Sequence, residues 1–185
     1  MTFDLQPTLE GRLLALRPLR AADWSDLFAV ASDPLVWEQH PEPDRCREDV
    51  FRVFFAAALE SGGALVALDV ESGRIVGSSR FHGYDEERSE VEIGWSFLAR
   101  SHWGGTYNGE MKRLMLEHAF RFVKSVVFLI GPGNLRSRRA IEKVGGVLVG
   151  SGFERGHECV VYRIARESRP VSAAGAGENR KGETP

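Results

Sequence analysis

The sequence predicts one α/β domain in which helices pack against a single mixed sheet. Two observations predict it. Segments with strand and helix periodicity follow each other in the order strand, two helices, three strands, helix, strand, helix, two strands. The chain has 185 residues, 43% of them hydrophobic and 27% charged, which suits one globular domain with its own core. We expect this domain to span residues 1–166, and we expect the small, polar tail at 167–185 to be disordered.

The N-terminal third supplies one strand and two helices. An apolar run at 13–19 predicts the strand. Apolar residues spaced i, i+3, i+4 and i+7 predict a helix at 21–32. A loop at 35–43 follows, and a second helix is expected at 44–60, because a Ser-Gly-Gly sequence ends it there.

Three strands are expected in the middle of the chain. The runs at 64–70 and 75–81 are separated by a short polar turn, so they predict a hairpin. A charged connection at 82–89 leads to a third strand at 90–98, in which apolar and polar residues alternate. This alternation predicts one apolar face made of Val91, Ile93, Trp95 and Phe97.

The C-terminal third is expected to add two helices and three strands. An apolar stripe predicts a helix that ends near residue 123. The uninterrupted apolar run at 126–130 predicts a strand that is buried on both faces. The last predicted elements are a helix at 134–144 and strands at 147–153 and 158–165.

Charge and composition exclude several functions. The formal net charge of −2 gives no basic surplus, so no nucleic-acid partner is expected. No apolar run approaches the roughly 20 residues of a membrane helix, and the N-terminus has no signal-peptide core, so we expect a cytoplasmic protein without a membrane partner. Cys46 and Cys159 stand alone and the five histidines show no ligand spacing, so no metal is expected.

The loop from Leu98 to Asn108 carries the first chemical signal. It joins a strand to a helix and places Gly104 and Gly105 just before the helix. A helix N-terminus presents free N–H groups and a partial positive charge, and glycines let an anion approach the backbone closely. The loop lacks the Gly-Lys-Ser/Thr of a P-loop and the spacing of a dinucleotide-binding loop. Alone, it fits a phosphate site and a plain glycine turn equally well.

The segment 134–146 carries the second signal. Asn134 is a good N-cap residue, and Ser137 follows in the first helical turn, near the positive end of the helix. A thiolate or phosphate there would be stabilised by the helix dipole and by the arginines at 136, 138 and 139. The alternative is that Asn134 only caps the helix and that the arginines form a solvated face.

Four motifs occur in a fixed order along the chain. They are Leu16-Arg17-Pro18-Leu19 with Asp23, then Val91-Glu92-Ile93-Gly94-Trp95, then Trp103-Gly104-Gly105-Thr106-Tyr107-Asn108-Gly109-Glu110, and finally Asn134-x-x-Ser137 leading to Glu142-Lys143-Val144-Gly145-Gly146. The ordered set resembles the GNAT superfamily of acyl-CoA-dependent N-acetyltransferases, in the branch of ribosomal-protein and small-molecule N-acetyltransferases. The resemblance covers roughly residues 13–165, and the order of elements agrees with it.

The resemblance implies a single mixed, mostly antiparallel sheet with a central splay and helices on both faces. It also implies acetyl-CoA as the acyl donor, with no metal. The pyrophosphate would lie on the loop before the helix, and the pantetheine arm would lie beside the strand end and near Asn134. The cofactor contacts implied are Phe97, Leu98, His102, Trp103, Gly104, Gly105, Thr106, Tyr107, Asn108, Asn134 and Arg138.

Two positions depart from the family pattern. Thr106 stands where Gly or Ala is preferred, so its φ is expected to stay in an ordinary region while Gly105 supplies the conformational freedom. Ile141 stands where many members carry a tyrosine that protonates the leaving thiolate. A serine can take this role in the resembling branch, which points to Ser137.

The reaction implied is direct attack of a primary amine on the thioester. The amine must be neutral to attack, and Glu92 is the expected base, with Glu90 as a weaker candidate. Either carboxylate could instead form an ion pair with Arg80 or Arg88. A backbone N–H near the end of the 90–98 strand would hold the oxyanion.

The acceptor is expected to be a small-molecule amine or a peptide N-terminus. The acceptor contacts expected are Trp37, Glu38, Tyr84 and Glu90, and His40 is also expected to line the acceptor entrance. Two alternatives stay open: a GNAT-like module that binds acyl-CoA without turnover, and an unrelated fold in which the glycine pair is only a turn. The resemblance is also compatible with a homodimer.

Overall fold

The computed structural model describes residues 2–154 and 156–168. The tail that is expected to be disordered therefore lies outside the described residues, apart from its first two residues. These two end a short 3-10 helix at Arg166–Ser168. Within the described ranges, no helix combines the length and apolar character needed to cross a membrane.

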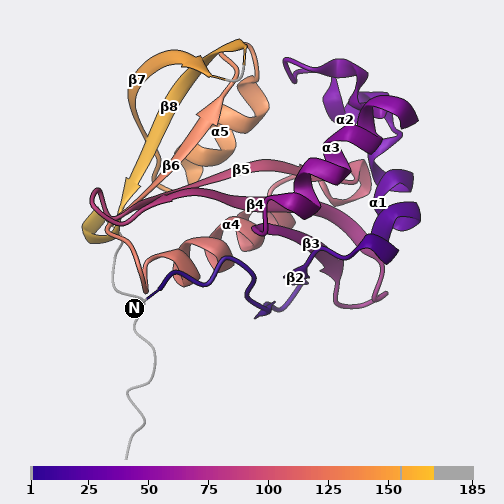
Figure 1. Ribbon diagram of the computed structural model, residues 1–185, viewed down its shortest axis with the longest axis horizontal. Helices are drawn as coiled ribbons and strands as arrows, with labels where there is room; N and C mark the ends of the chain where they lie inside the picture. Colours follow the sequence, from indigo (N-terminus) through magenta and orange to yellow (C-terminus); the bar gives the residue numbers. More distant parts are fainter. Residues whose placement is uncertain (1, 155, 169–185) are drawn as a thin grey trace, which may run out of the picture.

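One open sheet forms the centre of the molecule (Figure 1). In the described part of the chain it has eight strands in the order β1-β2-β3-β4-β5-β6-β8-β7, and only the β5–β6 pair is parallel. This confirms the mixed, mostly antiparallel sheet. The strands are β1 Leu9–Glu10, β2 Leu14–Pro18, β3 Ala64–Asp69, β4 Ile75–Asp85, β5 Glu90–Leu98, β6 Ser125–Ile130, β7 Val147–Glu154 and β8 His157–Ala165.

Helices cover both faces of this sheet, and each face has its own core (Figure 1). On one face α1, α2 and α3 pack around Trp37 and Phe51. On the other face α4 and α5 pack around Met115 and Ile141. The helices are α1 Trp24–Ala31, α2 Pro34–Trp37, α3 Glu48–Glu60, α4 Thr106–Ala119 and α5 Leu135–Lys143.

Some element boundaries differ from those predicted. The helix expected from residue 44 begins at Glu48, because Arg47 is extended and separates it from a 3-10 turn at Pro43–Cys46. β4 continues through the expected connection to Asp85, since its residues keep pairing with β5 up to the Asp85–Glu90 pair. The loop expected at 35–43 contains most of the short helix α2.

β5 and β6 separate after a short parallel ladder. This ladder joins Glu90–Glu92 to Ser125–Val127, and within the described residues it goes no further. Beyond it, β6 continues to pair with β8 and β5 with β4. The two strands thus open a gap in the sheet, which confirms the central splay.

A β-bulge at Trp95 changes which residues of β5 face each side. Trp95 has a φ of 51°, and two residues of β5 oppose the single residue Ser79 of β4. Ile93 therefore packs in the core under α4, whereas Phe97 packs in the core under α1–α3. The predicted single apolar face is wrong beyond Gly94, because the extra residue reverses the alternation.

Candidate active site

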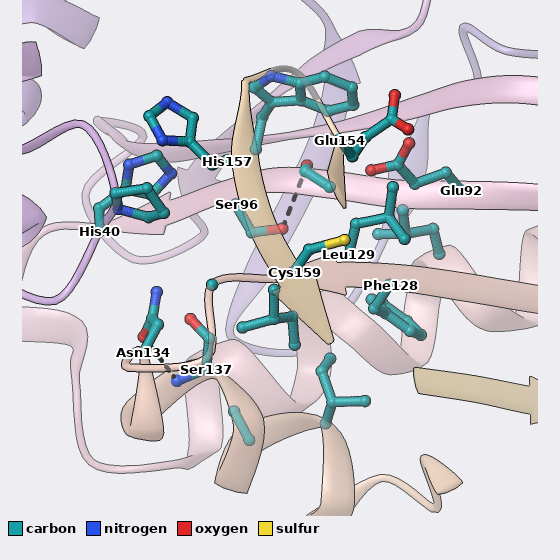
Figure 2. Close-up of a pocket in the computed structure, with 18 of the residues that line it drawn as sticks. His40, Glu92, Ser96, Phe128, Leu129, Asn134, Ser137, Glu154, His157 and Cys159 are labelled. Atoms are coloured by element: carbon teal, nitrogen blue, oxygen red, sulfur yellow. Dashed lines mark hydrogen bonds between the residues drawn. The ribbon is translucent and has the colours of Figure 1, made fainter. Parts of the chain in front are cut away.

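A pocket lies where β5 and β6 separate. Its walls come from α2 and the following loop, β5, α4, β6, α5 and the β7–β8 hairpin. Figure 2 shows Asn134 and Ser137 at one end of this pocket and the carboxyl groups of Glu92 and Glu154 at the other. The splay therefore brings Glu92 and Ser137 to one cavity from distant parts of the chain.

Glu92 is the last residue of β5 that pairs with β6. It is buried, with 7% of its surface exposed. Its carboxylate extends along the strand over Gly94. A Cβ added at Gly94 would lie 2.9 Å from Glu92 Oε1, so any larger residue there would push the carboxylate aside. The Gly94 of the sequence motif thus makes room for the side chain that precedes it by two residues.

The loop before α4 has the backbone expected of an anion site. Gly104 and Gly105 have φ angles of 103° and 117°, which only glycine adopts readily, and Gly105 caps α4. Thr106 is the first residue of the helix, as expected if Gly105 supplies the freedom. The N–H groups of the first turn have no partners inside the helix. Apart from the adjoining residues, no heavy atom of the described part of the chain lies within 4 Å of a Cβ added at either glycine, so the space beside the loop is open.

Three side chains of this loop and the start of α4, those of His102, Trp103 and Tyr107, make contacts around it. The indole N–H of Trp103 donates to the carbonyl of Leu98 at 2.9 Å. The hydroxyl of Tyr107 donates to Asp69 at 3.1 Å, and hydrogen bonds from Ser72 and Tyr107 hold the pKa of Asp69 below its usual value. His102 packs edge-on against Tyr107, with ring centroids 4.7 Å apart. These contacts hold the three rings close to the loop, while the positions of Gly104 and Gly105 stay uncrowded.

α5 begins at the pocket and presents its N-terminus to it. The side chain of Asn134 accepts a hydrogen bond from the N–H of Ser137 at 3.1 Å, which caps the helix (Figure 2). Both side chains line the pocket. Asn134 is therefore a cap, as its residue type predicts, and its position also leaves it on the pocket wall.

The arginines of α5 have different surroundings. Arg138 donates to the Tyr162 hydroxyl at 3.1 Å and to the carbonyl of Pro132 at 3.0 Å, so it is engaged outside the pocket. Arg136 donates to the carbonyl of Val36 at 3.0 Å, and its guanidinium lies 4.0 Å from the centroid of the Trp103 ring. Arg136 thus joins α5 to α2 and to the loop before α4.

The predicted acceptor contacts fall in three places. Trp37 lines the pocket, but it is 3% exposed and also fills the core, with its ring 4.9 Å from Phe97. Glu38 lines an adjoining hollow. Tyr84 packs against Phe3 at 5.3 Å, and Glu90 bonds to Ser125 at 2.8 Å and Arg163 at 2.9 Å. Neither Tyr84 nor Glu90 lines the pocket.

Several pocket residues were not predicted from the sequence. The segment after α2 and the β7–β8 hairpin contribute Glu42, Arg45, Glu154, His157, Glu158 and Cys159, whereas His40, which also lines the pocket, was expected near the acceptor. No local pattern marks these residues, because their proximity depends on contacts between distant segments. Lys112 of α4 also lines the pocket, and a local signal for it exists. It lies four residues before the buried Leu116 and seven before Ala119, so it falls on the buried side of the helix.

Burial lowers the pKa of two basic groups in the pocket. It lowers the pKa of His40 to about 3, with the nearby Arg45 as a second cause, so this imidazole is neutral at physiological pH. Burial also lowers the pKa of Lys112 to about 7. Among the residues that the structure describes, no group of three or more His, Cys, Asp or Glu side chains is arranged to hold a metal ion.

Comparisons with known proteins agree with this geometry. Residues 13–147 match a family model described as the acetyltransferase (GNAT) domain. No curated protein matches the chain. Three solved structures that match it have the same fold, with TM-scores between 0.66 and 0.77.

The first is a GCN5-related N-acetyltransferase from Brucella melitensis, with 20% identity and a TM-score of 0.77 over 88% of this chain and 80% of that chain. The second is an acetyltransferase from Agrobacterium tumefaciens, with 26% identity and a TM-score of 0.70 over 86% and 95%. The third is Mycobacterium smegmatis RimJ in complex with CoA-disulfide, with 19% identity and a TM-score of 0.66 over 90% and 89%. The family match spans most of the chain and the fold agrees with it, so this protein belongs to the GNAT acetyltransferase family.

Proposed function

We propose that this protein transfers an acetyl group from acetyl-CoA to a primary amine. The observation that carries the proposal is the pocket in the splay, which holds a buried carboxylate from β5 and a hydroxyl from the first turn of α5. Such a pair can take a proton from the attacking amine and stabilise the departing sulfur. The pocket also reaches Asn108 in the first turn of α4, so it connects to the predicted phosphate site.

The loop before α4 would hold the pyrophosphate of CoA. Open space above Gly104 and Gly105 lets phosphate oxygens approach the first-turn N–H groups, where the helix dipole favours negative charge. His102, Trp103 and Tyr107 would border this site, since their side chains pack around the loop. The pantetheine arm would extend from the loop along Phe97 and Leu98 towards Asn134, within the splay.

Glu92 would act as the base. An alkylamine is mostly protonated at neutral pH, so its ammonium must lose a proton before the nitrogen attacks the thioester carbon. Glu92 is buried, and its carboxylate points into the pocket in which the amine would meet the thioester. As the C–S bond breaks, Ser137 would donate a hydrogen bond to the thiolate, aided by the positive end of α5.

The charges at the pocket support a cationic amine as the acceptor. Glu42, Glu154 and Glu158 join Glu92 in the lining, and Trp37 and Trp95 add aromatic surface. Arg45 offsets part of this negative charge through its ion pair with Glu42. Carboxylates attract an ammonium group, and aromatic faces also bind it favourably. A small-molecule amine and a peptide N-terminus both fit this description.

The test is a thiol-release assay with acetyl-CoA over a panel of amines and peptide N-termini. We expect Glu92→Gln to lower kcat about 100-fold or more and Ser137→Ala to lower it about tenfold to 100-fold. Calorimetry should show CoA affinity within about twofold of wild type for both, because neither side chain is needed for the phosphate site. The control is Glu117→Gln, an exposed carboxylate of α4 that pairs with Arg113 outside the pocket. Wild-type kcat in both pocket variants would disprove these roles.

One observation favours a second candidate, an acyl-CoA-binding module without turnover. Ile141 is buried in the pocket lining, at the position where many family members carry a tyrosine acid. An isoleucine cannot protonate a thiolate. Acetyl-CoA binding without thiol release from any amine in the panel would establish this second candidate.

A further inference from the structure

Lys112 places a buried amine inside the splay. It is 4% exposed, and its Nζ donates a hydrogen bond to Ser96 Oγ and lies 5.4 Å from the centroid of the Phe128 ring. Ser96 is on β5 and Phe128 is on β6, so the amine reaches the gap between the two separated strands. In Figure 2 Ser96 lies in the middle of the pocket, between the Glu92 end and the Ser137 end.

This amine has no counter-ion among the residues that the structure describes. Within residues 2–154 and 156–168, no carboxylate forms an ion pair with Lys112. Ser96, its hydrogen-bond partner, is neutral and is bonded in turn to Ser79 at 2.7 Å. A buried ammonium without a negative partner costs free energy, and such groups concentrate at functional sites. Burial lowers the pKa of Lys112 accordingly, to about 7.

The position of this amine relative to the bulge suggests what it binds. Ser96 directly follows Trp95, and these two residues form the bulge that interrupts the β4–β5 ladder between Gly94 and Phe97; the same stretch forms part of the pocket wall. A thioester held between the phosphate site and Glu92 would have its carbonyl group at this wall. Negative charge develops on that carbonyl oxygen when an amine attacks, and this charge would be the missing partner of the ammonium.

Given the acyl transfer proposed above, we propose that Lys112 is a catalytic residue that donates a hydrogen bond to the thioester carbonyl oxygen and stabilises the oxyanion. The amine nitrogen forms a bond to the carbonyl carbon, and the electron pair of the C=O bond moves to oxygen. The C=O bond then re-forms, and the C–S bond breaks with its electron pair on sulfur. Glu92 has taken the ammonium proton before the attack, the second proton that the nitrogen loses as the amide forms goes to the departing thiolate, and Lys112 keeps its own proton throughout.

The first test is independent of turnover. It compares two CoA thioethers that cannot transfer an acyl group: S-acetonyl-CoA, which has a ketone near sulfur, and S-propyl-CoA, which does not. Calorimetry on wild type should show about tenfold tighter binding of the ketone, the effect of one hydrogen bond from a charged donor. Lys112→Met should remove this preference and keep the affinity for S-propyl-CoA. No preference in wild type, or a preference retained in Lys112→Met, overturns the proposal.

A spectroscopic measurement on wild type covers the case in which Lys112→Met does not fold. In protein labelled with 15N at lysine Nζ, S-acetonyl-CoA should shift the Lys112 signal more than S-propyl-CoA does. Equal shifts overturn the proposal. We expect the variant to fold, since methionine replaces an uncompensated buried amine with an apolar group of similar length.

The second test measures turnover. Lys112→Met should lower kcat about 100-fold or more, because it removes a donor to the oxyanion. The control Lys124→Met removes an exposed lysine outside the pocket and should not change kcat. Unchanged kcat in Lys112→Met overturns the catalytic role. If wild type releases no thiol with any amine but shows the ketone preference, the proposed transfer fails while the carbonyl contact of Lys112 is supported.

Discussion

At the scale of single residues, the Glu110 carboxylate joins α4 to the N-terminal strands. It accepts hydrogen bonds from the backbone N–H groups of Arg12 at 3.0 Å, Leu13 at 2.7 Å and Leu14 at 2.9 Å. Burial alone would raise the pKa of Glu110, but these three donors outweigh it and hold the pKa below its usual value. The ionised form therefore stabilises the fold.

Glu110→Gln is expected to lower the free energy of unfolding by about 1–3 kcal/mol at pH 7, since its amide cannot accept all three bonds. The folded-state pKa is depressed, so the stabilisation is complete above the unfolded value of about 4.3 and is lost as the pH falls through the folded value. Urea unfolding at pH 7 and at pH 3 measures the difference, which should shrink at the lower pH. Glu117→Gln on the same helix, with an exposed ion pair, should change stability by less than about 0.5 kcal/mol. An equal loss at both pH values would show that the charge is not involved.

The sequence predicted correctly those pocket residues that belong to a local sequence motif. Glu92 and Ser137 each belong to such a motif, and both lie in the pocket. Tyr84 and Glu90 were expected there, but they lie near the far end of the β4–β5 hairpin, since β4 continues to Asp85. Lys112 was not assigned to either face of its helix, although its spacing from Leu116 places it on the buried side.

At the scale of elements, the junction of β5 and α4 depends on backbone conformation more than on side-chain contacts. Gly104 and Gly105 both have positive φ angles, and neither is crowded. A side chain at either position would therefore be strained by its backbone conformation alone. Gly109, four residues further on, is helical and equally open, so it offers a matched control.

Gly105→Ala is expected to lower the free energy of unfolding by about 1–3 kcal/mol, through the cost of holding alanine at a φ of 117°. It should also weaken CoA binding, because relief of the strain would move the first-turn N–H groups of α4. Gly109→Ala should have the opposite effect on stability and raise it by about 0.5–1 kcal/mol, because alanine favours a helix over glycine. Urea unfolding and calorimetry with CoA measure both effects. Loss of CoA affinity in Gly109→Ala, with wild-type affinity in Gly105→Ala, would contradict the assignment of the loop.

Of two irregular backbone segments, the glycine loop before α4 could be predicted from the sequence and the bulge at Trp95 could not. The loop was predicted, because two adjacent glycines stand between a predicted strand and a predicted helix. The bulge at Trp95 was not, since tryptophan rarely adopts a positive φ and the residues around it alternate normally in the sequence. The conformation of Trp95 comes with tertiary contacts: Arg80 lies 4.4 Å from the centroid of its ring, and His82 packs edge-on at 5.1 Å.

At the scale of the whole molecule, the order of elements and the family motifs sufficed to predict the sheet, its splay and the helices on both faces. They could not predict which segments complete the wall of the pocket. That depends on where the loop after α2 meets the β7–β8 hairpin, as in the 3.6 Å approach of His157 to Glu42. Contacts of this kind join segments more than a hundred residues apart, and neither segment carries a pattern that indicates its partner.

β7 is the least protected strand of the sheet. It lies at one edge, and all its residues are exposed, including Val147, Leu148 and Phe153 at 62%, 50% and 71%. It contains no lysine or proline, the residues that commonly keep an edge strand from pairing with another chain. An apolar edge strand with free N–H and C=O groups can pair with the same strand of a second copy about a two-fold axis.

We therefore expect the protein to form a homodimer through β7. Phe153→Lys should convert it to a monomer, because a charge would have to be buried at the pairing edge. Size-exclusion chromatography with light scattering, run over a range of protein concentrations, measures the mass directly. The control is Val53→Lys, which places the same charge on the exposed face of α3, where Val53 is 72% exposed, and should leave the dimer intact. A wild-type monomer at all concentrations, or a dimer that survives Phe153→Lys, would exclude β7 as the interface.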